Sequence, residues 1–441
     1  MDSLTYIQLL RKNRSFRRLW IGQVISEMGN WFNFIAALGL VRVVSNASPE
    51  VTTIMLVLRI APFTLVAPLA GAFVDRWSRR RVMIATDVIR VIVALGFLFV
   101  RRPEDLWLAY LCTGLLSFFG TFFEAAKNAA VPNITGERDL LAGNALMFSS
   151  RFLFMSLGAG LGGWTSAHVG YGAAFVINAI SFLASAYSVW LVPENETRQA
   201  PSTVEGESPK PRRGYWQDIR EGWSYIVSHG PVATIIGINI VWATGGGAIN
   251  LIIDRLGGIV FGGQNAVDPD SAVAAFYIAN GLGLFIGMMI ARRVGTYFET
   301  TGRIVGFIGW SLLFQGIVFA FIGIMPTLWL ACLFLFMSRA LLGVEFAVQE
   351  TLLMRLVPDN LRGRVSTTDR ASEMLVWTFS TVVAGWSLYR ITPRTLTVVS
   401  GLLSGIAGLV WLVLFAARVV RLPRRFNSAS RRVEQPLTAT D

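Results

Sequence analysis

Apolar runs of about twenty residues recur along this 441-residue chain and are broken only by short charged or Pro/Gly-containing segments. About 20 apolar residues are enough for a helix to cross the hydrocarbon core of a bilayer. Charged residues make up only 15% of the chain, whereas water-soluble domains carry about 25%. The sequence therefore predicts an all-α integral membrane protein.

The apolar runs fall into two sets of six, separated by a polar stretch. We expect the first six spans near residues 20–43, 51–73, 82–100, 105–127, 140–163 and 170–192. We expect the second six near residues 231–254, 271–291, 303–324, 327–350, 370–391 and 394–417. The predicted fold is thus twelve transmembrane helices in two six-helix bundles, residues 1–192 and 231–417. Residues 193–230 are predicted to form a cytoplasmic linker with an amphipathic helix, and residues 418–441 a basic cytoplasmic tail.

The two halves share a short repeat. Residues 124–132 (EAAKNAAVP) align with residues 350–358 (ETLLMRLVP) at a constant offset of 226. Each copy begins with Glu and closes with Val-Pro, so we expect the Val-Pro pair to end span four and span ten. Parallel repeats of this kind place a binding site between the halves near the bilayer midplane.

Lys and Arg residues are distributed unequally between the predicted loops. The segments on the side of the N-terminus hold 29 of the 39 Lys and Arg residues. The five assigned to the opposite side are Arg101, Arg102, Arg255, Arg390 and Arg394. Because positive residues favour the cytoplasmic face, both termini are expected in the cytoplasm, in a bacterial inner membrane. The net charge of +12 then faces anionic lipid, and no nucleic-acid partner is expected.

Signatures of catalysis and metal binding are absent from the sequence. It contains no GxSxG, GxxxxGK[ST] or HExxH motif, and its two cysteines and two histidines form no ligand cluster. We therefore expect no enzymatic activity, no metal and no cofactor.

The most specific motif is Gly71-Ala-Phe-Val-Asp75-Arg76-Trp-Ser78-Arg79-Arg80-Arg81, between spans two and three. It resembles the signature loop of the major facilitator superfamily, in which a glycine precedes Asp-Arg by four residues and a basic pair follows. The resemblance implies a cytoplasmic gate formed by Gly71, Asp75, Arg76, Arg79 and Arg80. Gly71 would permit close helix approach, Asp75 would face a helix N-terminus, and the arginines would bind carboxylates.

Three more segments resemble the branch of that superfamily with enterobactin and macrolide exporters and the lysophospholipid transporter. They are Asp87-Val-Ile-Arg90, Gly143-Asn144-Ala145 with Gly160-Leu-Gly162-Gly163, and Val357-Pro358-Asp359-x-x-Arg362-Gly363-Arg364-Val365. In span five, Gly158, Gly160, Gly162 and Gly163 offer a small-residue face for helix packing. Ala159 stands where the antiporters of the family carry proline.

Ionisable residues inside the spans are costly and mark functional positions. Gln23, Glu27 and Asn30 share one helical face, and Glu27 is our first candidate for a proton-coupling carboxylate, with pairing to Arg59 or Arg151 as the structural alternative. Asp87 and Arg90 are expected to pair, either for stability or for coupling. The residues predicted for proton coupling or the substrate cavity are Glu27, Asn30, Asp87, Arg90, Arg151, Arg339, Glu345 and Gln349.

Aromatic residues offer a lining for an amphipathic ligand, although packing explains any single ring as well. The candidates are Trp242, Trp377, Phe118, Phe119, Phe122 and Phe123. Glu124, Glu350 and Glu373 are expected to snorkel or to form gate salt bridges near cytoplasmic helix ends.

The branch resemblance implies a monomeric exporter of an amphipathic small molecule, surrounded by membrane lipids and with protons as the coupling ion. Two alternatives stay open. One is a lipid or lysophospholipid flippase whose headgroup site uses Arg59, Arg151 or Arg339. The other is a membrane scaffold that transports nothing.

Overall fold

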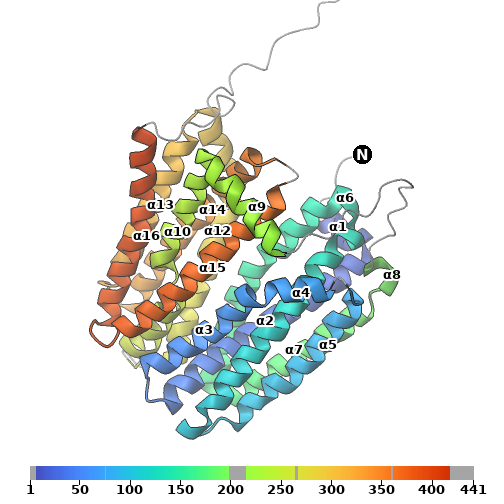
Figure 1. Cartoon of the computed structure of the whole chain (residues 1–441). Helices are drawn as coiled ribbons and strands as arrows, with labels where there is room; N and C mark the ends of the chain where they lie inside the picture. Colours follow the sequence, from blue (N-terminus) through green and yellow to red (C-terminus); the bar gives the residue numbers. More distant parts are fainter. Residues whose placement is uncertain (1–5, 75, 198–214, 264–266, 359–360, 418–441) are drawn as a thin grey trace, which may run out of the picture.

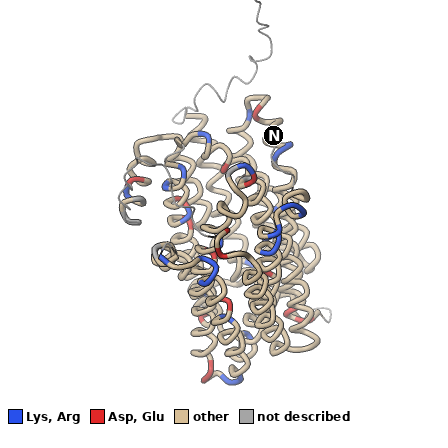
Figure 2. Tube along the Cα trace, turned by 90° about the vertical axis from the view of Figure 1, so that its right-hand side faces the viewer, with Lys and Arg blue, Asp and Glu red and all other residues tan. Residues whose placement is uncertain are grey.

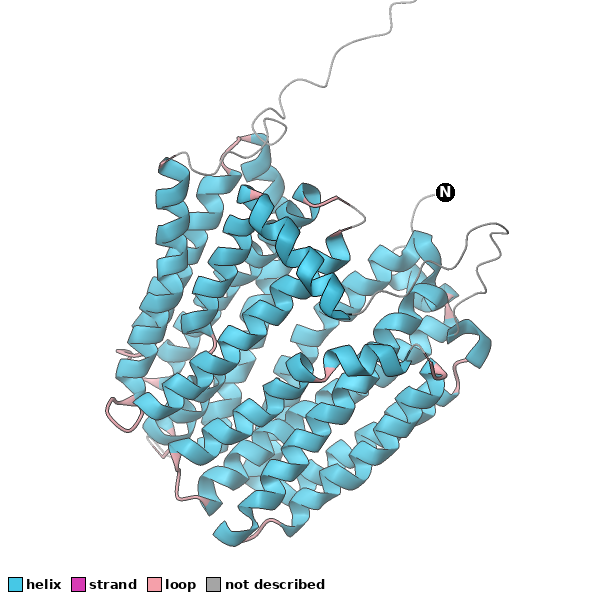
Figure 3. Cartoon of the chain, viewed as in Figure 1, coloured by secondary structure: helices cyan, strands magenta, loops and turns pink. Residues whose placement is uncertain are grey.

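The computed structural model describes residues 6–74, 76–197, 215–263, 267–358 and 361–417. Within these ranges every regular element is a helix and no strand occurs (Figure 3). The prediction of an all-α chain is therefore confirmed. Asp75, residues 198–214 of the predicted linker and the whole predicted basic tail lie outside the described residues.

The N-terminal half consists of helices joined by short turns. They are α1 (Tyr6–Lys12), α2 (Arg14–Val44), α3 (Pro49–Leu65), α4 (Ala67–Val74), α5 (Arg79–Gly96), α6 (Leu106–His168), α7 (Tyr171–Trp190) and α8 (Glu194–Thr197), with 3₁₀ turns η1 (Phe97–Phe99) and η2 (Pro103–Asp105). Helix α6 is two spans in one element, because Gly136 has a φ of 70° and bends the chain between them.

The C-terminal half follows the same pattern. Its helices are α9 (Tyr215–Ser228), α10 (Gly230–Gly246), α11 (Ile249–Arg255), α12 (Pro269–Thr300), α13 (Ile304–Ile322), α14 (Leu328–Leu356), α15 (Arg362–Ser387) and α16 (Pro393–Ala416), with a π-helical turn η3 (Leu256–Phe261) after α11. Helix α9 forms where the amphipathic helix is predicted, and it packs on α15 and α10.

Polar caps and prolines set several helix starts. The Asn13 side chain accepts a hydrogen bond from the Phe16 amide at 2.8 Å, and the Asp268 carboxylate accepts one from the Asp270 amide at 2.9 Å. Proline occupies the first turn of α3, α12 and α16, where its missing N–H costs no intrahelical bond. The sequence thus encodes these boundaries locally.

Ten helices of the described residues are long and apolar enough to cross a membrane. Two predicted spans do not reach that length and hydropathy. The first is divided at Val66 between α3 and α4; the second, α15, carries charged residues in its first half, among them Arg364, Asp369 and Glu373.

The repeat predicts one helix end correctly and one wrongly. Helix α14 ends at Leu356, with Val357 as its C-cap. In α6, by contrast, Val131 and Pro132 lie inside the helix, which continues to the kink at Gly136. The chain turns at glycine because only glycine adopts a positive φ without a steric cost.

The helices form two groups that lie side by side in Figure 1. In the first group α2 and α5 pack on α6 and α7; in the second α12 packs on α14, and α13 on α14 and α16. The groups contact each other through α6 with α12 and α3 with α15. We call the end with α1, α8 and α9 in Figure 1 the upper end and the opposite one the lower end.

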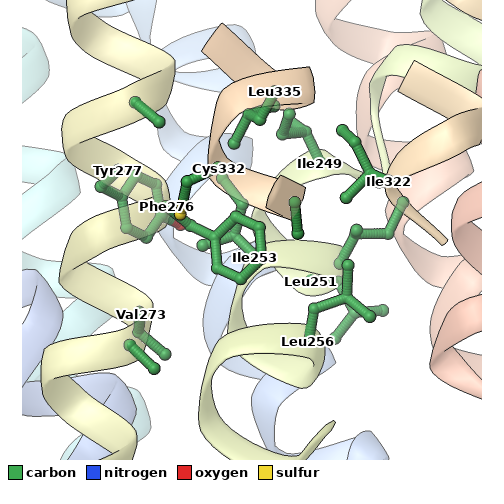
Figure 4. Packing of buried hydrophobic residues seen from close by; sticks show 14 of the residues in the cluster. Ile249, Leu251, Ile253, Leu256, Val273, Phe276, Tyr277, Ile322, Cys332 and Leu335 are labelled. Atoms are coloured by element: carbon green, nitrogen blue, oxygen red, sulfur yellow. The ribbon is translucent and has the colours of Figure 1, made fainter. Parts of the chain in front are cut away.

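The apolar core joins the groups only toward the lower end. One buried cluster combines Phe34, Leu38 and Leu56 of the first group with residues of the second, including Ile253, Leu256 and Phe276 (Figure 4). Two other clusters each stay within one half, drawing on residues 9–192 and 226–411. In Figure 2 most segments carrying Lys or Arg lie in the upper half of the molecule.

Candidate functional site

A cavity of about 260 Å³ lies where the two groups of helices meet. Helices α2 and α6 contribute to its wall from the first group, and α10, α12, α14 and α15 from the second. The polar residues and tryptophans that line it are Trp31, Asn239, Trp242, Asn250, Tyr277, Asn280, Arg339, Glu345, Gln349, Glu350, Glu373 and Trp377. Arg339, Glu345 and Gln349 are the predicted cavity residues that the structure brings together.

Close packing of α12 on α14 positions Arg339. A Cβ atom on Gly283 would lie 2.8 Å from the Arg339 Cβ and 2.6 Å from the Phe336 carbonyl oxygen. A Cβ on Gly287 would lie 2.3 Å from the Ala340 carbonyl oxygen. Side chains at these positions would therefore push the helices apart. Gly283 and Gly287 form a Gly-x-x-x-Gly pattern, a recognised sequence signal for close helix contact from which this packing could have been predicted.

Glu345 and Gln349 lie one turn apart on α14, beside a chain of hydrogen bonds. The Gln349 side chain donates to Asn239 Oδ1 at 2.5 Å, and Asn239 donates to the Asp369 carboxylate at 3.2 Å. This chain ties α14 to α10 and α15. Glu373, one turn from Asp369 on α15, interacts electrostatically with Glu345, so two carboxylates repel each other at this part of the wall.

Two ionisable groups in the cavity wall lack partners. Arg339 is 4% exposed and Glu345 is 2% exposed, yet Arg339 Nε and Glu345 Oε1 have no hydrogen-bond partner among the described residues. The Arg339 guanidinium lies over the Phe319 ring, 4.9 Å from its centroid. Burying an unsatisfied polar atom costs about 1–3 kcal/mol, and more when the group is charged. These two groups therefore suit a ligand.

Aromatic rings form much of the remaining wall. Trp242 and Trp377 lie with ring centroids 5.6 Å apart, and both line the cavity, as does Trp31. The four phenylalanines from Phe118 to Phe123 do not line it; they lie in the first half of α6, where Phe118 packs edge-on to Phe119. Glu350 and Glu373, which we expected in gate salt bridges, line the cavity instead.

Glu27 and Asn30 are not among the lining residues. Glu27 Oε1 lies 3.7 Å from Arg151 Nε and accepts a hydrogen bond from Trp31 Nε1 at 3.2 Å. Glu27 is thus tied to Arg151, the structural alternative weighed for it. Arg59 lies instead over the Phe34 ring, 3.9 Å from its centroid.

Asp87 and Arg90 form the expected pair on α5. The Arg90 guanidinium donates to the Asp87 carboxylate, and both side chains are buried in the first group of helices. Arg90 also lies over the rings of Phe123 and Phe182, with centroid distances of 4.8 and 4.2 Å. The pair does not line the cavity, and its position within one bundle favours a stabilising role.

The four predicted packing glycines face two different helices. A Cβ on Gly158 would lie 2.9 Å from the Trp31 Cβ, and one on Gly162 would lie 2.8 Å from the Phe32 Cα, both on α2. A Cβ on Gly160 would lie 2.9 Å from the Ile278 side chain, and one on Gly163 would lie 2.3 Å from the Ala274 Cβ, both on α12. This stripe of α6 therefore packs within its own group and against the other group at once.

Arg79 and Arg80 of the loop motif bind backbone carbonyls and not the carboxylates expected for them, whereas Arg81 lies 3.6 Å from the Glu194 carboxylate. Arg79 donates to the carbonyl oxygens of Ala129 at 2.8 Å and Thr197 at 3.2 Å, and Arg80 donates to the carbonyl of Trp190. Cations suit the carbonyl-rich end of a helix. A Cβ on Gly71 would meet no atom within 4 Å, so this glycine makes no close helix contact in this conformation. Arg76 is exposed, and Asp75 lies outside the described residues.

A buried charge cluster joins the two groups at the lower end. Arg42 on α2 contacts Asp254 on α11, with Nη2 and Oδ1 2.6 Å apart, and Asp270 on α12, with Nη1 and Oδ1 3.0 Å apart. A Cβ on Gly258 would lie 2.3 Å from Arg42 Nε, so glycine leaves room for the guanidinium. The sequence does not predict this cluster, because Arg42 lies more than 200 positions before Asp254 and Asp270.

Arg255 also links the two groups of helices at the lower end. Our assignment of this residue to an external loop was wrong. The residue is 1% exposed, at the end of α11. Its guanidinium donates to the carbonyl oxygens of Ala47 at 2.5 Å and Ser48 at 2.9 Å, in the turn between α2 and α3. Arg42 and Arg255 therefore each reach from one group of helices into the other.

The architecture agrees with the match of the sequence to a known family. Residues 19–312 match the family described as Major Facilitator Superfamily. This chain belongs to the major facilitator superfamily. Members of this superfamily are transporters and not enzymes.

Curated relatives within the superfamily are distant and match only part of the chain. The uncharacterized MFS-type transporter YfiS of Bacillus subtilis (strain 168) is 24% identical over 221 residues, which cover 49% of this chain and 50% of YfiS. BacE of Bacillus subtilis (strain 168), named as a candidate bacilysin exporter, is 30% identical over 175 residues, 39% of this chain and 42% of BacE. The chain therefore spans about half the length of these two relatives.

Solved structures share the fold over nearly the whole chain. A bacterial homologue of the iron transporter ferroportin, in an inward-facing state, superposes with a TM-score of 0.64 at 15% identity, covering 90% of this chain and 98% of that one. The nucleoside transporter NupG superposes with a TM-score of 0.66 at 13% identity, covering 91% and 98%. At such identities the likeness concerns the fold alone.

Proposed function

We propose that this transporter exports an amphipathic small molecule across a bacterial inner membrane in exchange for protons. The observation that carries the proposal is the cavity between the two groups of helices, where aromatic rings surround two buried ionisable groups without partners. A small-molecule site in proteins is typically concave and mostly apolar, with a few polar groups that fix orientation. The related chain of BacE, named as a candidate exporter, supports the outward direction.

Twelve spans in two six-helix bundles are part of this proposal. Ten helices in the described part of the chain are long and apolar enough to cross the membrane. The eleventh span is α3 continued into α4 across the break at Val66. The twelfth is α15, whose charged half would pack against other helices and not against lipid. The contacts of α15 with α3, α9 and α10 support that placement of α15. The upper end, where Lys and Arg gather (Figure 2), would then face the cytoplasm together with both termini.

We infer alternating access from the contacts that hold the two groups of helices together at the lower end. The charge cluster around Arg42 and the shared apolar core close the lower end, whereas the upper cores stay separate. We take the structure as the state open to the cytoplasm, ready to load the cargo. Export requires the cluster to break and the upper halves to meet.

Proton coupling is assigned to Glu345 ahead of Glu27. Glu345 is buried in the cavity wall, has an unpartnered oxygen, and lies near Glu373. Glu27 is tied to Arg151 and Trp31. A carboxylate that can bind either a proton or a cationic substrate group couples the two without further machinery.

The test measures proton flux into or out of proteoliposomes that contain the purified protein. A pH-sensitive dye is trapped inside, and amphipathic compounds are added on one side. Substrate-dependent proton movement in the wild type, lost in Glu345→Gln and kept in Glu27→Gln, is the expected result. The reverse pattern would return the coupling role to Glu27. Compound or lysophospholipid movement that ignores uncouplers would favour the flippase, and no movement of any compound would favour the scaffold.

A further inference from the structure

The cavity wall has a positive part and a negative part, and each contains one buried ionisable group with an atom that has no hydrogen-bond partner among the described residues. Arg339 marks the positive part; Glu345 marks the negative part, together with Glu373. If the site served a purely cationic or purely apolar cargo, Arg339 would remain buried and unpaired during binding. If it served an anion, Glu345 and Glu373 would repel the cargo.

Helix geometry sets the spacing of the two parts. Arg339 and Glu345 are six residues apart on α14, which corresponds to about 9 Å along the axis at 1.5 Å per residue. Both side chains tilt toward the helix N-terminus, so their charged ends keep roughly this separation along the axis. Two to three residues of extended peptide span about 7–10 Å.

Aromatic and aliphatic side chains form other parts of the wall of this cavity. Phe346 and Leu342 on α14 and Trp377 on α15 line the same cavity, and Trp242 packs against Trp377. These rings suit an apolar or aromatic middle, because offset and edge-on ring contacts favour aromatic partners. The cavity volume of about 260 Å³ limits the cargo to a small molecule.

From this arrangement we propose that the cargo is zwitterionic and of dipeptide to tripeptide length. Its carboxylate binds Arg339, its ammonium group binds Glu345 with Glu373, and its apolar side chain contacts Trp242 and Trp377. A guanidinium suits a carboxylate because its planar fork matches the two oxygens. The proposal rests on the transport function proposed above and names its class of substrate.

Three probes of matched size test the proposal. They are alanyl-phenylalanine, its C-terminal amide, which lacks the negative charge, and its N-acetyl derivative, which lacks the positive one. Binding to the purified full chain in nanodiscs is measured by competition against tritiated alanyl-phenylalanine and by calorimetry. We expect the zwitterion to bind about tenfold or more tightly than either derivative, because each derivative leaves one buried charge without a partner.

Two variants test which charged side chain binds which end of the cargo. Arg339→Gln should erase the preference for the free carboxylate over the amide and keep the preference for the free ammonium group. Glu345→Gln should erase the preference for the free ammonium group over the N-acetyl derivative and keep the preference for the free carboxylate. Matched controls are Arg390→Gln and Glu104→Gln, which change the same charges at the lower end, away from the cavity, and should leave both preferences intact. Size-exclusion profiles and thermal unfolding verify that each variant is folded.

The comparison of the three probes on the wild-type chain stands even if a variant fails to fold. Equal binding of the zwitterion and its amide would overturn the proposal in favour of a cationic cargo, as would an unchanged selectivity in a folded Arg339→Gln chain. No binding of any probe, together with proton flux driven by other amphipathic compounds, would reject the zwitterion and leave the export function intact. Binding with the expected selectivity but without proton flux would uphold the site and reject proton-coupled export.

Discussion

Arg42 and Asp254 form a buried ion pair, 2.6 Å between Nη2 and Oδ1, that links helices from opposite halves of the chain. Both side chains are at most 7% exposed. Asp270 shares the same guanidinium. In the alternating access that we propose, the halves separate at one end at a time, so this pair would break when the lower end opens.

Removing one partner of this pair should destabilise the closed state strongly. Asp254→Asn leaves Arg42 with Asp270 as its remaining partner, and Arg42→Gln leaves Asp254 with Arg255 and removes the arginine from Asp270. Breaking a buried ion pair in this way should cost up to about 5 kcal/mol. The double variant should recover part of that loss, which gives a coupling energy of about 0.5–3 kcal/mol. Thermal unfolding in detergent of the four chains completes the cycle. Additive single effects would show that the two residues act independently.

Gly258 should behave as part of the same cluster although it has no charge. In Gly258→Ala the new Cβ would lie 2.3 Å from Arg42 Nε, so the guanidinium must move away from Asp254. We expect a lower unfolding temperature, and little further loss when Asp254→Asn is added. Gly306→Ala on α13 is the matched control, because its Cβ meets no atom within 4 Å. That control should be neutral or stabilising by up to about 1 kcal/mol.

The Asp87–Arg90 pair should prove to be a stabilising element of the first group. Asp87→Asn strands the Arg90 guanidinium among buried rings and should cost about 3–5 kcal/mol. The double variant with Asp87→Asn and Arg90→Gln should be more stable than the single one and should keep substrate-dependent proton flux. Loss of flux in a folded double variant would establish a coupling role for the pair.

Arg79 should matter for its geometry as well as its charge. Its guanidinium reaches the carbonyls of Ala129 and Thr197, two hydrogen bonds from a charged donor. Arg79→Ala should cost about 1.5–3 kcal/mol per bond lost, and Arg79→Lys should recover only part of it, because an ammonium lacks the fork of a guanidinium. Arg76→Ala, an exposed neighbour in the same motif, is the control and should change unfolding little.

Local patterns in the sequence are sufficient to predict most of the helices. Apolar runs, Asn13 and Asp268 caps and prolines at first turns determine where most spans start, because these signals act within one or two turns. The exceptions are also local in origin. The chain breaks at Gly136 instead of Pro132 because glycine alone accepts the positive φ there.

The cavity could be predicted only in part. Arg339, Glu345 and Gln349 stand out in the sequence because charged and polar residues inside a span are expensive. Glu27, Asp87 and Arg90 stand out for the same reason, yet they pair within the first group. The free-energy cost of a charge inside a span does not by itself tell whether that charge has a partner in the fold.

The tertiary structure decided which charges have partners. Arg42 meets Asp254 and Asp270, and Arg255 meets the turn at Ala47, only because α2, α11 and α12 converge at the lower end. Arg339 and Glu345 each keep an atom without a hydrogen-bond partner among the described residues, because both groups face the cavity where the two groups of helices meet. The sequence determined the helices and their membrane setting through local hydropathy, while the pairing of distant charges depends on helix packing that no local pattern records.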